Sequence, residues 1–141
     1  MPRATPKIRH IAIMTMNPKK AAQFYSDVFD MKVVHRNKKG NYFISDGYIT
    51  LALLRNVADG RLSGLNHLGF HISDSKTIEK RLKKYKVFGP TARPADRPFA
   101  EVRVTDPEGV NIDLSVQGFD RVRPGAKGAT GRAKKESRAA R

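Results

Sequence analysis

The sequence predicts an α+β protein made of two copies of one βαβββ unit. The first observation is a 57-residue internal repeat, in which His10-Ile11-Ala12-Ile13 aligns with His67-Leu68-Gly69-Phe70. A similarity at a fixed period indicates two copies of one supersecondary unit. The second observation is that both halves show the same order of patterns, which is one strand, one helix and three more strands. Each copy therefore begins with a strand that carries a histidine on the same face.

The first copy is predicted over residues 7–55. Its opening strand covers 7–16, after which Asn17 and Pro18 suit the cap and the first position of a helix. An apolar stripe at i, i+3, i+4 and i+7 from Ala21 gives this helix one face for packing on a sheet. Short apolar segments separated by turn residues then predict three strands, over 32–36, 42–45 and 48–54.

A connector over 56–64 precedes the second copy, which is predicted over 65–117. Its opening strand covers 66–73, and Ser73 or Asp74 can cap the helix that follows, over 74–85. The remaining predicted elements are a weak, proline-interrupted strand region over 87–93, a strand over 99–105, the turn Asp106-Pro107-Glu108-Gly109 and a closing strand over 110–116.

Length and composition favour one domain over 7–117, preceded by a disordered lead-in over 1–6. The chain has 141 residues and 39% hydrophobic content, which supports one packed core. It has no cysteine, which excludes disulfides and thiolate metal sites. No apolar run approaches about 18 residues, and the N-terminus lacks the apolar core of a signal peptide. A cytoplasmic protein without membrane contact is therefore expected.

The formal net charge of +15 is high for this length. Residues 120–141 carry +6 of it, and +9 remains on residues 1–119. A basic body favours anionic partners. Residues 118–141 are rich in glycine and basic side chains, which predicts a flexible basic tail. Such a tail can hold nucleic acid through salt-dependent contacts, although a solubilising role is the favoured interpretation.

Four segments of the chain resemble one known superfamily. These segments are His10-Ile11-Ala12-Ile13, Ala22-Gln23-Phe24-Tyr25, His67-Leu68-Gly69-Phe70 and the stretch from Thr105 to Leu114, in which an Asp-Pro-Glu-Gly turn precedes Ile-Asp-Leu. Together they resemble the vicinal oxygen chelate superfamily, which includes glyoxalase I, extradiol dioxygenases, fosfomycin-resistance transferases and bleomycin-resistance proteins. The resemblance implies that both modules form one curved mixed sheet around a cleft, with the helices outside. It also implies a homodimer.

The resemblance further implies a divalent metal site. His10 and His67 correspond to the histidine ligands of the family, and Asp113 lies where the family usually has glutamate. The fourth corner falls at Leu51 or Ala52, neither of which can bind a metal. Two imidazoles and one carboxylate favour iron or manganese, and zinc and nickel are compatible with them. The open positions would let a substrate chelate the ion through two neighbouring oxygens.

The aspartate leaves two functions open. Its side chain is shorter than glutamate by one methylene, about 1.5 Å, so the strand shifts, a water bridges, or the site has lost its metal. The first function is a metal-dependent enzyme of dioxygenase or lyase type, acting on a small anionic or vicinal-oxygen substrate. The alternative is a metal-free protein that binds or sequesters a small molecule.

Three further side chains are candidates for catalysis. Glu101 and Arg103 alternate on one face of a strand, where Glu101 could act as acid or base and Arg103 could bind a carboxylate or phosphate. The alternative for these two is a cross-strand ion pair with no catalytic role. His71 is a candidate second base, or simply a polar residue near a strand end. Tyr42, Tyr48 and Phe99 could shape an aromatic pocket or belong to the core.

Overall fold

The structure is a computed structural model that describes residues 5–95 and 99–118. Its first module consists of β1 (Lys7–Thr15), α1 (Pro18–Phe29), β2 (Lys32–Arg36), β3 (Tyr42–Ser45) and β4 (Thr50–Arg55). Its second module consists of β5 (Gly64–His71), α2 (Ser75–Leu82), β6 (Thr91–Ala92), β7 (Val102–Thr105) and β8 (Asn111–Ser115). The α+β class and the two βαβββ modules predicted from the sequence are confirmed.

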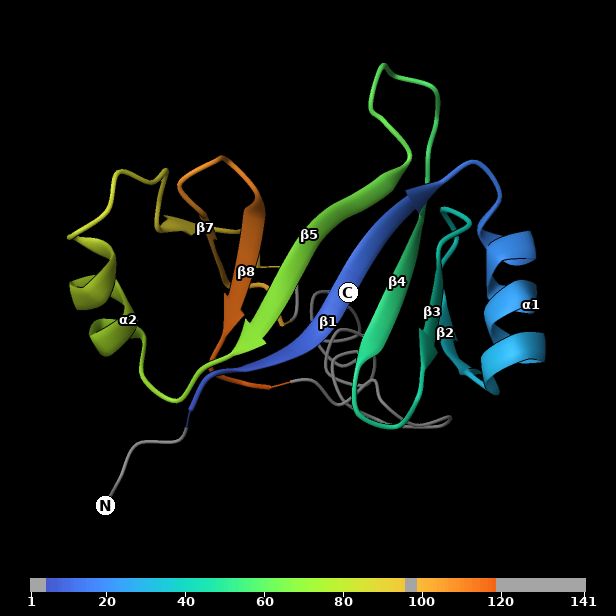
Figure 1. The fold of residues 1–141 in the computed structure, drawn as a ribbon, viewed down its shortest axis with the longest axis horizontal. Helices are drawn as coiled ribbons and strands as arrows, with labels where there is room; N and C mark the ends of the chain where they lie inside the picture. The colour runs from blue at the N-terminus through green and yellow to red at the C-terminus, as the bar shows by residue number, and fades with distance from the viewer. Residues whose placement is uncertain (1–4, 96–98, 119–141) are drawn as a thin grey trace, which may run out of the picture.

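The strands form one mixed sheet in the order β2-β3-β4-β1-β5-β8-β7-β6. The first strands of the modules, β1 and β5, lie antiparallel at its centre, and each runs parallel to the last strand of its own module. Exchanging the modules reproduces the same order, so the sheet has a pseudo-twofold axis between β1 and β5. Figure 1 shows the two helices outside the sheet at its opposite ends.

Each helix packs on the strands of its own module. In α1, Ala22 is buried against Ile44, Leu51 and Leu53. The corresponding cluster of the second module contains Ile72, Val104 and Leu114, with Ile78 and Leu82 of α2 packed against it. Both helices are capped as the sequence predicts, since the side chains of Asn17 and Asp74 accept hydrogen bonds from the first-turn backbone. Neither described helix is long and apolar enough to cross a membrane.

The register at the sheet centre follows the 57-residue repeat. His10 pairs with Gly69, and Ala12 pairs with His67, so each pair is the image of the other under the repeat. Gly69 has a steric reason to be glycine, because a Cβ built there would overlap the imidazole of His10. The repeat in the sequence therefore corresponds to a symmetry of the fold.

Several predicted element ends differ from the structure. The strand expected from residue 48 begins at Thr50, because Asp46 accepts hydrogen bonds from the backbone N–H groups of Tyr48 and Ile49 and holds them in the turn. The strand expected from residue 99 begins at Val102, and Phe99 has a φ of 63°, which a strand does not allow.

The second helix was expected to reach residue 85 and ends at Leu82. The backbone bonds that follow, from Lys84 N–H to the carbonyl of Arg81 and from Tyr85 N–H to the carbonyl of Leu82, each span three residues and belong to turns. The opening strand of the second copy covers Gly64–His71 instead of 66–73, because Gly64 and Leu65 pair with the end of β1. Residues 1–4 of the expected lead-in, and 119–141 of the expected tail, lie outside the described residues.

Candidate metal centre

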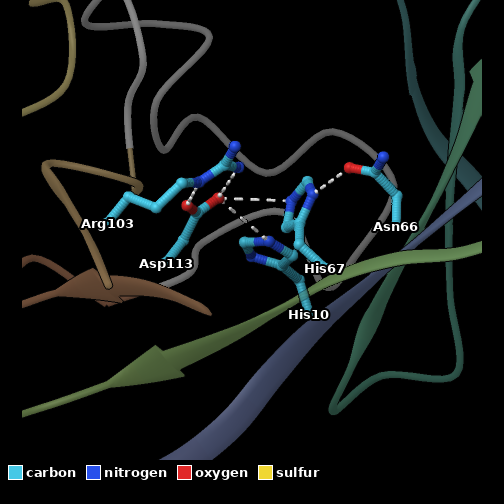
Figure 2. A network of polar contacts seen from close by, with 5 residues as sticks. All are labelled: His10, Asn66, His67, Arg103 and Asp113. Atoms are coloured by element: carbon cyan, nitrogen blue, oxygen red, sulfur yellow. Dashed lines mark hydrogen bonds and ion pairs between the residues drawn. The ribbon is translucent and has the colours of Figure 1, made fainter. Parts of the chain in front are cut away.

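The three predicted metal ligands come from three neighbouring strands. His10 lies on β1, His67 on β5 and Asp113 on β8. Gly69 of β5 pairs with His10 on one side and with Asp113 on the other, so these two side chains share one face of the sheet. His67 is two residues before Gly69 and points to the same face. Figure 2 shows all three side chains directed toward one another.

The donor atoms of this triad lie close together and away from solvent. The distance from Asp113 Oδ2 to His67 Nε2 is 3.2 Å, and that to His10 Nε2 is 3.8 Å. One donor atom from each residue lies within 4.8 Å of the other two. The imidazole rings meet edge to face, with centroids 5.0 Å apart. Asp113 is 2% exposed and His10 is 8% exposed.

Asn66 orients the imidazole of His67. His67 Nδ1 lies 2.7 Å from Asn66 Oδ1 (Figure 2), and because an amide oxygen can only accept, this contact favours the tautomer that carries the proton on Nδ1 and turns the lone pair of Nε2 toward Asp113. The pKa of His67 is lowered mainly by burial, so the ring is neutral at neutral pH. The Asp113 carboxylate opposes this shift. A fixed neutral imidazole whose second nitrogen is held by a hydrogen bond is typical of a metal-binding histidine.

The spacing of the donors fits a divalent ion. Ligands held at about 2.0–2.2 Å from one ion lie about 2.8–3.6 Å from one another, with the shorter values in octahedral and the longer ones in tetrahedral geometry. The distance between His67 Nε2 and Asp113 Oδ2 is in this range, and the distance from His10 is slightly longer. In the tautomer with the proton on Nδ1, the lone pair of His67 Nε2 faces Asp113 Oδ2 at 3.2 Å, and a cation between the two atoms would stabilise this arrangement. Despite its short side chain, Asp113 reaches both imidazoles.

Arg103 is the strongest partner of Asp113. Its Nε donates to Oδ1 at 2.7 Å and its Nη2 donates to Oδ2 at 3.1 Å, a bidentate ion pair. The two residues face each other in register on β7 and β8. The cross-strand ion pair that the sequence left open as an alternative is present for Arg103, with Asp113 as its partner, whereas Glu101 accepts a hydrogen bond from Ser115. The carboxylate expected to bind a cation already holds one.

The fourth corner of the site is Ala52. On β4 it pairs with Ala12 and with Phe43, just as Asp113 pairs with Gly69 and with Arg103. Its neighbour Leu51 points to the other side, into the core beneath α1. Of the two positions left open by the sequence, Ala52 is therefore the counterpart of Asp113, and it carries no donor.

A cleft of about 490 Å³ opens above the triad. Its lining residues are His10, His35, Asn37, Lys38, Lys39, Asn41, Phe43, Thr50, Ala52, Leu54, His67, Arg93, Phe99, Ala100, Arg103 and Asp113. Asp113 is the one acidic residue among these described lining residues, against four lysines and arginines. The cleft is therefore electropositive at neutral pH, which suits an anionic ligand.

The remaining candidates lie in different places. Phe99 lines the cleft, whereas Tyr42 packs against the core of the first module. Tyr48 is half exposed and lies beneath the guanidinium of Arg9. His71 and Glu101 are not among the residues that line the cleft.

His71 is the last residue of β5, and Gly118 packs against its ring. Glu101 accepts a hydrogen bond from the hydroxyl of Ser115 at 3.0 Å, and its other oxygen has no partner among the described residues. The structure thus brings Arg103 to the triad and leaves Glu101 and His71 apart from it. The catalytic roles of all three stay predictions.

Sequence reasoning missed several residues of the cleft. Lys38 and Lys39 were assigned only to a turn, and His35 only to a strand. Their shared feature, visible in the sequence, is that they surround the hairpin between the second and third strands of the first module. No local pattern shows that this hairpin lines the same cleft as residues of the second module, because that depends on the curvature of the whole sheet.

Comparison with known proteins identifies the family. Residues 7–114 match the family model described as the Glyoxalase/Bleomycin resistance protein/Dioxygenase superfamily. The chain belongs to this superfamily, as the resemblance of its motifs implies. The comparison with curated protein sequences gives no significant match.

Solved structures share the fold at low sequence identity. Methylmalonyl-CoA epimerase from Mycobacterium tuberculosis is 23% identical, with a TM-score of 0.53 over 76% of this chain and 85% of that one. A hypothetical protein from Bacillus halodurans is 18% identical, with a TM-score of 0.58 over 82% and 99%. The 2,3-dioxygenase LapB from Pseudomonas is 19% identical, with a TM-score of 0.59 over 77% of this chain and 39% of that enzyme.

Proposed function

We propose that this protein is a metal-dependent enzyme of the superfamily, of dioxygenase or lyase type, that acts on a small anionic or vicinal-oxygen substrate. The observation that carries the proposal is the convergence of His10, His67 and Asp113 at the cleft, with one donor atom from each within 4.8 Å of the others. The epimerase and dioxygenase named among the structural neighbours are enzymes on the same fold, which is consistent with it.

Each residue at the cleft would have its own role in binding the metal or the substrate. His10, His67 and Asp113 would hold a divalent ion, iron or manganese by preference and zinc or nickel as alternatives. The ion would supply Lewis-acid chemistry to two neighbouring oxygens of the substrate. Asn66 keeps the Nε2 lone pair of His67 directed at the site. Arg103 would hold an anionic group of the substrate beside the triad.

The basic residues at the rim of the cleft would attract and orient the substrate. Lys38 and Lys39 come from the first module and Arg93 from the second, so the rim is positive on both sides. Glu101 and His71 remain proposed as acid or base groups, which requires a substrate or a movement that extends the cleft toward them.

The proposal extends to organisation. We take residues 7–117 as one domain, with modules over 7–55 and 65–117 joined by the connector 56–64, and 118–141 as a flexible basic tail. A homodimer in the cytoplasm is consistent with the family resemblance. Nucleic-acid binding through the tail is the weakest of the proposed interactions.

Metal analysis tests the central part of the proposal. The full chain is stripped with chelator, reconstituted separately with Fe²⁺, Mn²⁺, Zn²⁺ and Ni²⁺, desalted, and assayed for metal by mass spectrometry. We expect about one ion per chain for at least one metal, and loss of that ion in His10→Ala and His67→Ala. His71→Ala is the matched control and keeps the ion. Metal-free protein after every reconstitution would reject the proposal.

A metal-free binding protein is the second candidate. The bidentate pair between Arg103 and Asp113, and the donor-free corner at Ala52, favour it. In that case the chelator-treated protein would bind small anions as tightly as the reconstituted protein does. Affinity that depends on the metal would favour the enzyme.

A further inference from the structure

We infer that the cleft binds a divalent cation and a carboxylate anion together, and that the two ligands replace the ion pair between Arg103 and Asp113. This inference rests on the proposed metal site and adds the class of ligand and its coupling to the metal. In the structure, Arg103 and Asp113 satisfy each other through two hydrogen bonds of 2.7 and 3.1 Å. Arg103 thereby occupies the place that a cation would take beside Asp113, and Asp113 occupies the place that an anion would take beside Arg103.

The cation and Arg103 compete for the same carboxylate. Asp113 Oδ2 is the oxygen nearest to both imidazoles, and Arg103 Nη2 donates to that oxygen. The carboxylate is nearly inaccessible to solvent, so a second positive charge placed beside it is poorly screened. A divalent ion bound by the triad would therefore repel the guanidinium and weaken its hold on Asp113.

An anion relieves this repulsion. Arg103 lines the cleft and its side chain is 22% exposed, so it can reach a ligand there, whereas Asp113 is enclosed. The planar guanidinium makes the same two parallel hydrogen bonds to a ligand carboxylate as to Asp113. Lys38 and Lys39 add positive charge to the same cleft.

The two ligands are then thermodynamically coupled. A carboxylate that takes Arg103 frees Asp113 for the ion, and an ion that takes Asp113 frees Arg103 for the carboxylate. Because linkage is reciprocal, each ligand raises the affinity of the other by the same factor, and couplings of this kind are typically about 5- to 150-fold. The resting ion pair thus keeps the metal affinity low until the anionic substrate arrives.

The test measures Mn²⁺ affinity by calorimetry at pH 7.5, with and without saturating benzoate, a monocarboxylate that does not chelate metals. In the wild-type protein, benzoate tightens Mn²⁺ binding about fivefold or more. In Arg103→Leu, Mn²⁺ binds at least about fivefold more tightly than in the wild type, and benzoate has no further effect. Arg103→Lys, which keeps the charge but not the paired geometry, gives an intermediate affinity. Arg103→Gln replaces Arg103→Leu if the latter does not fold, as judged by circular dichroism.

Lys20→Leu is the control, because it removes one positive charge from an exposed position on α1, away from the lining of the cleft. It changes the Mn²⁺ affinity less than twofold. Equal or weaker Mn²⁺ binding in Arg103→Leu, or wild-type affinity that benzoate leaves unchanged, overturns the inference while the metal site stands. Failure of every variant to bind any of the four metals overturns the proposed function and this inference with it.

Discussion

The two modules have the same topology but different chemistry at equivalent corners. In the second module, Asp113 and Arg103 face each other across β7 and β8 and form a buried ion pair. In the first module, Ala52 and Phe43 take the same two positions across β3 and β4. Both modules supply one histidine to the centre. The symmetry of the backbone therefore builds the cleft, and at this pair of positions the second module alone carries an ion pair.

This difference explains how a repeat can diverge without loss of the fold. The helix of each module packs on the side of the sheet opposite to the cleft, in separate core clusters. Cleft-facing positions such as Ala52 and Asp113 alternate with these core positions along their strands. A change on the cleft face therefore leaves the packing beneath the helix intact.

The largest effect on stability is expected when Asp113 of the second module is replaced by the alanine found at the equivalent position, Ala52, of the first module. Asp113→Ala removes one partner of the buried pair and leaves Arg103 uncompensated. We expect a loss of about 3 kcal/mol in the free energy of unfolding, at the low end for such pairs because Arg103 keeps some access to solvent. Urea denaturation measures it.

The double variant Asp113→Ala with Arg103→Phe copies the first-module corner of Ala52 and Phe43. Replacing a buried ion pair by apolar groups is often close to neutral, so most of the lost stability returns while metal binding stays absent. A double variant less stable than Asp113→Ala would show that the two corners are not equivalent in packing.

A smaller effect is expected at the pair of residues across the pseudo-twofold axis, Gly69 and Ala12. Gly69→Ala forces the imidazole of His10 to move, because the new Cβ overlaps it. We expect a loss of about 1–3 kcal/mol in stability and at least a tenfold loss of Mn²⁺ affinity. Ala12→Gly, at the equivalent position, removes a methyl group and costs about 1 kcal/mol with little change in Mn²⁺ affinity. Equal Mn²⁺ affinity in Gly69→Ala and the wild type would contradict the close packing of His10 on this glycine.

The opposite substitution gives the first module a carboxylate at the position equivalent to Asp113. Ala52→Glu places a donor at the fourth corner, on the strand beside His10. We expect Mn²⁺ to bind about tenfold more tightly, because an anionic oxygen ligand suits this ion. Ala52→Gln, which is neutral and has the same size, raises the affinity less. No gain in either variant would place Ala52 outside reach of the triad.

The smallest effect concerns the turn that precedes the last strand of the first module. Backbone hydrogen bonds from Ile49 and Tyr48 lower the pKa of Asp46 from its usual value of 3.8. Its contribution to stability is therefore present above about pH 4 and is lost as the pH falls through the lowered pKa. Asp46→Ala should lose a small part of its stability at pH 7 and show a shallower decrease in acid. If the unfolding temperature of Asp46→Ala falls with acid pH as steeply as that of the wild type, this role of Asp46 is contradicted.

Physical signals in the sequence predicted the element order and the two equivalent histidines, whereas the role of His10, His67 and Asp113 as one ligand set came from the resemblance to the superfamily. The order of helices and strands could be predicted because it depends on local signals. These signals are the 57-residue repeat, the caps at Asn17 and Asp74 and the period-two pattern of the strands. The ends of elements were less predictable, since Tyr48 and Phe99 are held out of strands by a turn carboxylate and by a positive φ.

The pairing of Arg103 with Asp113 could not be read from the sequence. Ten residues and one turn separate them, and the alternation of Glu101 and Arg103 along one strand indicated a cross-strand ion pair without identifying its partner. Residues opposite each other on antiparallel strands depend on the register, which the turn after Thr105 fixes. The rim residues Lys38 and Lys39 depend on sheet curvature, a property of the whole fold.

The most direct test of the central claim is pulsed electron paramagnetic resonance of the Mn²⁺-loaded full chain, which detects nitrogen atoms bound to the ion. The account predicts couplings from two imidazole nitrogens in the wild type, and uncoupled, hydrated Mn²⁺ in His67→Ala, which loses the bound ion. A wild-type spectrum of fully hydrated Mn²⁺ without nitrogen coupling would contradict it.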